Sequence, residues 1–145
     1  MKNILVPGIA VLLISGILIL AEAGDTEKSF RKGIEYTNQG KYDQAIEKFT
    51  EVITGDKDYA NAYLALGIVY INKKMEKEAV TLLEKSIELN PELKKAYFVL
   101  ARLCEKMEEN DKAVLLLEKY LTLDPDKKFA DIAQKHLLRL KDKNE

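Results

Sequence analysis

Few residues of this chain could carry acid–base or nucleophilic chemistry, and they are scattered along it. His136 is the only histidine, and no Cys, Asp or Glu stands one helical turn after it. A metal site needs three or four ligands, and a catalytic base needs an acidic or nucleophilic partner. We therefore interpret His136 as an ordinary surface or helix-edge histidine.

Cys104 is the only cysteine, so a disulfide within the chain is impossible. A reactive thiol needs exposure and nearby positive charge, whereas Cys104 falls on the inner face of a predicted helix, which favours a buried structural thiol. The pair Glu108 and Glu109 is interpreted as solvated turn residues. The sequence holds no Gly-rich phosphate loop, GxSxG or HExxH motif. We predict no catalytic, cofactor-binding or metal residues, no cofactor and no enzyme activity.

Composition favours a helix-rich globular protein. Of the 145 residues, 32% are charged and 47% apolar, with seven glycines and three prolines. The 23 basic and 24 acidic residues leave a formal charge of −1, and no long run of one sign stands out. Because binding to nucleic acid needs clustered Lys and Arg, we expect no nucleic-acid partner.

An uncharged segment of 18 residues, 4–21, lies close to the N-terminus. It is typical of a secretory signal, since Lys2 precedes it and Ala21 and Ala23 form an A-x-A pattern with cleavage before Gly24. It is also typical of a retained anchor, because 18 residues of helix span ~27 Å, close to the ~30 Å core of a bilayer. Residues 1–23 are thus a signal peptide or a membrane anchor.

Both alternatives predict the same topology. Lys2 favours a cytoplasmic N-terminus, and the acidic residues Glu22, Asp25 and Glu27 follow the apolar segment. We therefore expect the rest of the chain to be extracytoplasmic. It would be periplasmic or secreted after cleavage, or held at the membrane through residues 4–21.

The remainder of the sequence repeats with a period of 34 residues. Small, aromatic, leucine and proline positions all share this interval, which chance coincidence does not explain. The series are Ala45, Ala79 and Ala113; Gly33, Gly67 and Ala101; Tyr36, Tyr70 and Cys104; Phe49, Leu83 and Leu117; and Pro91 and Pro125.

Each period predicts two helices joined by a short turn. Tyr63, Leu66 and Tyr70 share one face of a helix, and Ala79 and Leu83 begin the apolar stripe of the next. The turns fall at Gly40, at Lys74 and Met75, and at Glu108 and Glu109. Pro91 and Pro125 follow the second helices, which they terminate because proline disfavours helical backbone in the residue before it.

The repeating unit resembles the tetratricopeptide repeat, whose pattern is W-x2-L-G-x2-Y, then A-x3-F, then P. The unit 60–93 matches best, 94–127 follows it, and 26–59 is degenerate. The best match reads Tyr63-x2-Leu66-Gly67-x2-Tyr70, Ala79-x3-Leu83 and Pro91. Residues 128–141 resemble the capping helix that closes such arrays, with Phe129, Ile132, Ala133, Leu137 and Leu140 on its apolar face.

The resemblance implies an all-α fold: a right-handed α-solenoid of three helical hairpins and a C-terminal capping helix, preceded by the N-terminal apolar helix. It also implies that the first helix of each hairpin lines a concave groove that holds another protein's peptide or helix. The groove residues we predict from it are Phe30, Ile34, Asn38, Leu64, Ile68, Ile71, Asn72, Lys95, Phe98 and Arg102.

The groove would be apolar at its front and charged at its rear, through Lys95, Arg102, Glu105 and Lys106. Contiguous apolar surface tends to mark an interaction site, although some of these side chains are also expected to be core between hairpins. Some family members clamp a chaperone's C-terminal carboxylate with Lys, Asn and Arg. Here Phe30, Ile34 and Val99 occupy clamp positions, which disfavours that partner.

The sequence therefore predicts a protein–protein interaction module, a scaffold or adaptor on the extracytoplasmic side of a membrane. The alternative is a structural or self-assembling subunit of an envelope complex, in which the repeats pair into a homo-oligomer. A free groove on a monomer favours the first hypothesis, whereas an interface over Phe30, Ile34 and Ile68 favours the second.

Overall fold

The computed structural model describes residues 25–143. The predicted apolar helix at residues 4–21, with its two alternatives of signal peptide and anchor, lies outside this range. Within the range, none of the helices has the length and apolar character needed to cross a bilayer.

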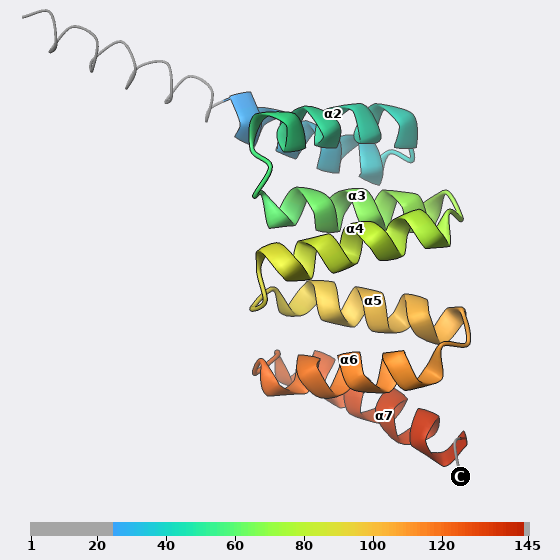
Figure 1. The fold of residues 1–145 in the computed structure, drawn as a ribbon. Helices are drawn as coiled ribbons and strands as arrows, with labels where there is room; N and C mark the ends of the chain where they lie inside the picture. Colours follow the sequence, from blue (N-terminus) through green and yellow to red (C-terminus); the bar gives the residue numbers. More distant parts are fainter. Residues whose placement is uncertain (1–24, 144–145) are drawn as a thin grey trace, which may run out of the picture.

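The described part of the chain is helical throughout, apart from its turns. A helix over residues 25–38 comes first. It is followed by α2 (Tyr42–Gly55), α3 (Ala60–Asn72), α4 (Glu76–Leu89), α5 (Lys94–Lys106), α6 (Asn110–Thr122) and α7 (Lys127–Lys143). The order in space follows the order in sequence, so the hairpins form a single stack (Figure 1).

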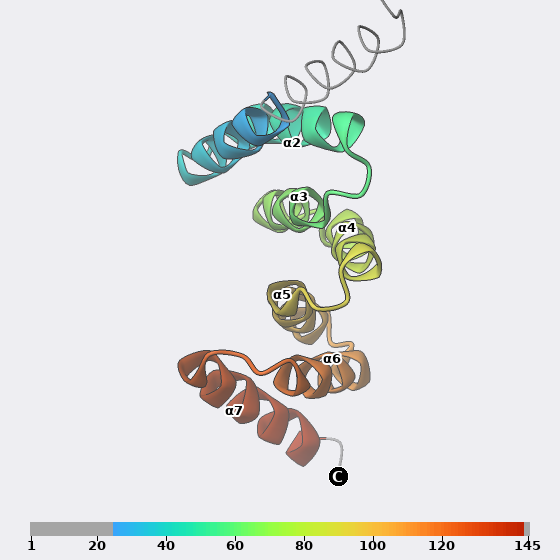
Figure 2. The same ribbon diagram turned by 90° about the vertical axis from the view of Figure 1, so that its left-hand side faces the viewer.

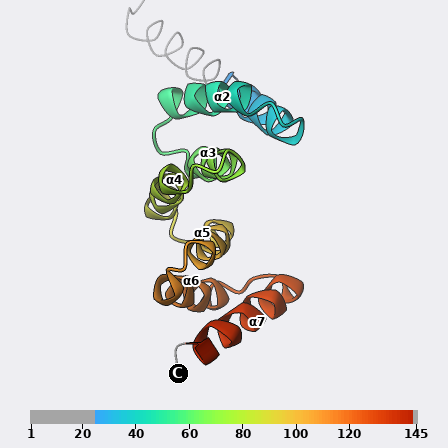
Figure 3. The same ribbon diagram turned by 90° about the vertical axis from the view of Figure 1, so that its right-hand side faces the viewer.

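The stack is curved, and its inner and outer helices separate cleanly. Figure 2 shows α3 and α5 on one side and α4 and α6 on the other, with α7 crossing beneath α6. The opposite view agrees (Figure 3). Consecutive helices from α2 to α7 pack on one another, as the 34-residue pattern predicts. The helix 25–38 and helices α3, α5 and α7 therefore form the inner wall.

The turn inside each hairpin has the same backbone geometry. Gly40, Lys74 and Glu108 adopt positive φ angles of 72°, 61° and 64° at intervals of 34 residues. The next amide in each turn donates back across the helix end: Lys41 N to Tyr36 O at 2.9 Å, Met75 N to Tyr70 O at 3.0 Å and Glu109 N to Cys104 O at 2.9 Å. This is the Schellman closure, which satisfies the last carbonyls of a helix and favours glycine at the left-handed residue.

Small residues bring the two helices of a hairpin close together. A Cβ placed on Gly33 would lie 2.6 Å from the ring of Phe49, and one on Gly67 would lie 3.0 Å from the side chain of Leu83. On the second helix of each hairpin, the repeating alanines Ala45, Ala79 and Ala113 are completely buried. Close packing of this kind is the physical basis of the small-residue series in the sequence.

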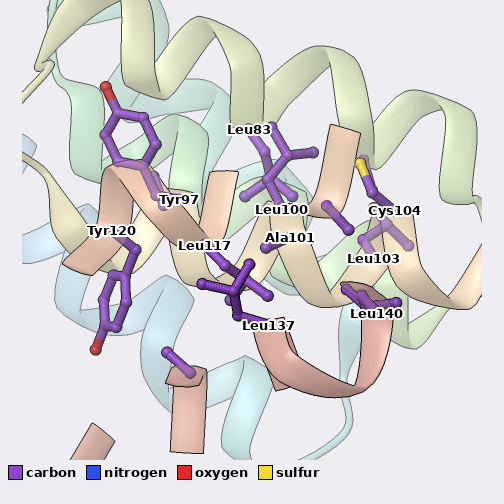
Figure 4. Close-up of a cluster of buried hydrophobic side chains, with 14 of the residues drawn as sticks. Leu83, Tyr97, Leu100, Ala101, Leu103, Cys104, Leu117, Tyr120, Leu137 and Leu140 are labelled. Atoms are coloured by element: carbon purple, nitrogen blue, oxygen red, sulfur yellow. The ribbon is translucent and has the colours of Figure 1, made fainter. Parts of the chain in front are cut away.

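Two clusters of buried side chains make the core. The larger runs from α3 to α7 and includes Leu83, Leu100, Leu117 and Leu140; in Figure 4 the first three lie close together, and Leu140 lies nearer to Leu103. The smaller joins α2 to α3 around Phe49. Helix α3 contributes to both, since Leu64 belongs to the larger cluster, and Ala65, Leu66 and Val69 belong to the smaller.

The closing helix packs less of its apolar face than its sequence suggests. Ala133, Leu137 and Leu140 are buried as expected. Phe129, predicted on the same face, is 48% exposed. Its ring lies instead beside that of Phe98, at 6.5 Å between centroids, because the first turn of α7 extends along the inner wall.

Candidate protein-binding groove

Two hollows follow each other along the inner wall. The first, of about 130 Å³, lies between the helix 25–38 and α3, and the side chain of Lys95 from α5 reaches it. The second, of about 340 Å³, lies between α3 and α5. Ile68 lines both, so the two hollows form one continuous surface. We call this surface the groove; its first hollow is lined by Phe30, Ile34, Thr37, Asn61, Leu64, Ala65, Ile68 and Lys95. The second is lined by Ile68, Ile71, Phe98, Val99, Arg102, Leu103 and Lys106.

Eight of the ten predicted groove residues line these hollows. They are Phe30, Ile34, Leu64, Ile68, Ile71, Lys95, Phe98 and Arg102. Asn38 and Asn72 are exposed near the ends of their helices and line neither hollow. They lie outside the hollows because each is the last residue of its helix, directly before the turn.

The apolar residues of the groove divide between surface and core. Ile34 is 40% exposed, which is high for an isoleucine. Ile68, Ile71 and Phe98 are partly buried against the larger core cluster. Leu64 is 4% exposed and belongs to that cluster, so it forms the floor of the groove and contributes mainly to stability.

A charged network occupies the end of the groove formed by α5 and α7. Glu105 lies at its centre with a side chain only 17% exposed. His136 Nδ1 lies 2.9 Å from one carboxylate oxygen, and Arg139 pairs with the other. Arg102 Nε is 3.9 Å from the same carboxylate. The carboxylate of Glu105 is therefore fully engaged within the protein.

His136 is thus more deeply placed than a surface residue. Its side chain is 19% exposed, and burial lowers its pKa, with the positive charges of Arg102 and Lys135 acting in the same direction. A neutral imidazole protonated at Nδ1 can donate to Glu105, whereas one protonated at Nε2 can accept at Nδ1 from Arg139, whose Nη2 lies 3.0 Å away. No sequence signal within α7 points to Glu105, because the two residues meet only when α7 packs on the array.

The register of the repeat identifies further groove residues. Adding 34 to Lys95, Phe98, Arg102 and Glu105 gives Phe129, Ile132, His136 and Arg139. These α7 residues thus occupy the positions that line the groove in earlier units. Extending the 34-residue interval past residue 127 would have found them in the sequence.

Cys104 is completely buried, as predicted. Burial raises the pKa of its thiol to about 11. A thiol with this pKa is protonated at neutral pH and is a poor nucleophile. Across residues 25–143, no three His, Cys, Asp or Glu side chains gather in a way that could hold a metal ion.

A third hollow, of about 520 Å³, lies away from the groove, where the start of the helix 25–38 meets the end of α2. Its lining is polar, through residues such as Ser29, Glu51 and Thr54, and Ser29 donates to Glu51 at 3.0 Å. Ligand pockets usually have mainly apolar walls, so this hollow does not resemble one.

Comparison with solved structures finds the same fold in many proteins. The TPR2B domain of yeast Sti1, solved as a complex with pHsp70, has a TM-score of 0.74 and 20% identity, covering 82% of this chain and 98% of its own. The type III secretion chaperone SycD of Yersinia enterocolitica, solved with a peptide of the translocator YopD, has a TM-score of 0.77 and 18% identity, covering 82% and 94%.

A further relative of the fold is the second TPR domain of human RPAP3, solved in complex with the HSP70 peptide SGPTIEEVD. It has a TM-score of 0.72 and 22% identity, covering 83% of this chain and 98% of its own. At these identities the likeness shows the fold alone. Among curated proteins, no sequence matches this chain.

Family profiles match most of the chain directly. One described as TPR repeat matches residues 33–74, and another described as tetratricopeptide repeat matches 60–93 and 94–127. The second profile covers the two units whose motifs are most complete. The matches agree with the helical hairpins, their shared turns and their small-residue contacts, and the chain belongs to the tetratricopeptide repeat family.

Proposed function

We propose that this protein is an interaction module that binds a peptide or helix of another protein in the groove, on the extracytoplasmic side of a membrane. The observation that carries the proposal is the continuous inner surface on which Ile34, Ile68, Ile71 and Phe98 remain partly accessible. Apolar side chains kept accessible along a hollow are typical of sites that take a partner's side chains. The peptide complexes of Sti1, SycD and RPAP3 support the same use of the fold.

Site-specific photocrosslinking in native membranes tests this function. A photoreactive amino acid replaces Ile68 in the full chain, and a matched variant carries it at Thr81, an exposed residue of α4. We expect a discrete adduct with another protein from position 68 and none from position 81. The same adducts from both positions, or none from position 68, would contradict binding in the groove.

The extracytoplasmic location rests on the sequence of residues 1–24 and needs its own test. Because Cys104 is buried, a cysteine introduced at exposed Asp142 would be the main target of a maleimide reagent. We expect a membrane-impermeant maleimide to label Asp142→Cys in intact cells of the native host, with the wild-type chain as control. Labelling only after lysis would contradict the location, and the intact mass of the protein would distinguish cleavage from anchoring.

Self-assembly by end-to-end stacking is less well supported. In a hairpin, Gly67 or Ala101 allows the second helix to approach, but the equivalent residue of α7 is Lys135, which is exposed. Neighbouring positions Asp131 and Gln134 are also polar and exposed. Because α7 therefore offers a solvated face, we expect light scattering of the full chain to show no open-ended polymer.

A further inference from the structure

The groove does not end at the third hairpin, because α7 forms a fourth part of its wall. The ring of Phe129 lies 6.5 Å from that of Phe98, between centroids. Arg139 and His136 both reach Glu105 on α5. These contacts place the start and middle of α7 beside the second hollow.

Charged side chains are unevenly distributed along the groove. At the equivalent inner position, the first three units carry Glu27, Asn61 and Lys95 in turn. Glu27 is exposed and pairs with Arg31 at 3.7 Å, and it accepts a hydrogen bond from Tyr59 at 3.3 Å. At the first end of the groove Glu27 is therefore balanced by Arg31, whereas the end formed by α5 and α7 carries several cations.

The cations at this end outnumber the carboxylates that they contact. Three basic side chains lie there: Arg102, Lys106 and Arg139. The carboxylates paired with them are Glu105 and Glu76, the latter at 2.9 Å from Lys106. One positive charge remains in excess, and a groove of one sign attracts a segment of the other.

The excess charge lies directly beside apolar surface. Arg102 and Lys106 line the same hollow as Ile71, Phe98 and Val99. The side chains of Arg102 and Lys106 are 51% and 59% exposed, so both can reach a bound segment. A segment that fits this hollow needs an apolar side chain and a carboxylate close together.

We propose that the groove selects segments in which apolar residues are accompanied by side-chain carboxylates, with the carboxylates lying at the end formed by α5 and α7. This inference rests on the proposed groove function and specifies its partner. Glu105 occupies part of the cationic end and so limits its attraction for the partner's acidic residues.

A random peptide library tests the selection. The full chain is the immobilised target, and the peptides are fused to a carrier through their C-termini, so that only side chains can supply carboxylates. We expect enriched peptides to contain more Asp and Glu, and fewer Lys and Arg, than the starting library. Enrichment of neutral or basic peptides would overturn the inference while leaving groove binding intact, whereas no enrichment would contradict the proposed function as well.

Charge reversal at one exposed cation links the selection to this end of the groove. We expect Arg102→Glu to weaken binding of an enriched acidic peptide by about three- to tenfold at low salt, in the range of exposed charge pairs at interfaces. Lys119→Glu is the matched control, since Lys119 is exposed on the outer helix α6 and makes the same change in net charge. Equal affinities of the two variants for that peptide would overturn the inference.

Glu105→Gln tests the same inference through an expected gain in affinity for the acidic peptide. The amide oxygen can still accept from Arg139, and the amide NH2 can donate to Nδ1 of the His136 tautomer that is protonated at Nε2, while the negative charge is removed from the network. We expect this variant to bind the enriched acidic peptide about two- to fivefold more tightly, with a steeper loss of affinity as salt rises. Unchanged or weaker binding by a variant with wild-type circular dichroism would show that the carboxylates lie elsewhere, and the inference would fail.

Discussion

The two ends of the array are built from similar repeats but are enclosed very differently. The larger cluster extends through α5, which packs against α4 on one side and α6 on the other, and it is closed by α7. The smaller cluster rests on Phe49 and a few residues of α3 and α2. In the helix 25–38, only Gly33 is buried. A repeat with one neighbour gains interface energy on one side only, so the first hairpin should open more readily than the rest.

The largest expected effect on the free energy of unfolding comes from truncating a side chain in the larger cluster. Leu100 is 1% exposed, and we expect Leu100→Ala to lower the free energy of unfolding by about 3 kcal/mol, because it loses buried area and leaves a cavity. Urea titration measures the change. The variant should speed hydrogen exchange from α3 through α7, since these helices share the cluster.

Leu115→Ala serves as the control for that variant. Leu115 is 67% exposed on α6, so its truncation should change the free energy of unfolding by less than about 0.5 kcal/mol. If the two truncations destabilised the protein equally, the difference between cluster and surface would be wrong.

The next effect compares two glycines at equivalent positions. A methyl group at Gly33 would contact the buried ring of Phe49 at 2.6 to 2.8 Å, so Gly33→Ala should cost about 1–2 kcal/mol even after the gain in helix propensity. At Gly67 the nearest atoms belong to Leu83 at 3.0 and 3.1 Å, and Gly67→Ala should be close to neutral. Thermal unfolding of both variants checks this, and a larger loss at Gly67 would reverse the expected order.

Thiol labelling compares how readily the two ends of the array open under native conditions. Cys104 is completely buried, and its raised pKa of about 11 keeps the thiol protonated, so labelling at neutral pH requires the surrounding helices to open. In a Cys104→Ala background, Val52→Cys places a thiol at a buried site of α2. We expect Val52→Cys to react at least about tenfold faster than Cys104 under native conditions.

Two controls make the labelling rates comparable. Val52→Ala measured by urea titration gives the destabilisation caused by truncation alone, and labelling in denaturant gives the intrinsic rate of each thiol. Equal native rates after these corrections would mean that the first hairpin opens only with the rest of the array.

The smallest effects are expected at the turns. Lys74 and Glu108 hold left-handed backbone that glycine adopts without strain, whereas the equivalent residue of the first hairpin is already Gly40. Lys74→Gly and Glu108→Gly should each raise the free energy of unfolding by about 0.5–1 kcal/mol, and Gly40→Ala should lower it by about 1 kcal/mol. Chemical denaturation of the three variants checks the signs, and destabilisation by both new glycines would contradict the argument.

Much of this fold is predictable because packing repeats with the chain. The series through Gly67 and Ala79 marks where helices touch, and Pro91 marks where a hairpin ends; the structure places helix contacts and a helix end there. The conformations of Lys74 and Glu108 are not predictable from residue type, because neither is typical of left-handed backbone. There the repeated hairpin geometry overrides local preference.

The lining of the candidate groove was predictable in part, and for a different reason. Ile68 and Phe98 were predicted from the resemblance to the tetratricopeptide repeat, which implies that the first helix of each hairpin lines the groove, and both line the second hollow. Leu64 faces the same way but is covered by neighbouring helices, which depends on packing between units. The contact of His136 with Glu105 also depends on packing, since 31 residues separate them.

Gly40, Lys74 and Glu108 reverse the chain with the same backbone geometry. In every hairpin the second helix therefore runs in the same direction relative to the first. An internal duplication of residues 60–93 would therefore add one more helical hairpin to the stack. Both faces of the new hairpin would pack against neighbours of the same kind as those that residues 60–93 already contact. The groove would lengthen by one inner helix while its two ends moved apart. Evolution could therefore change the length of the recognised segment without changing the chemistry of the groove's two ends.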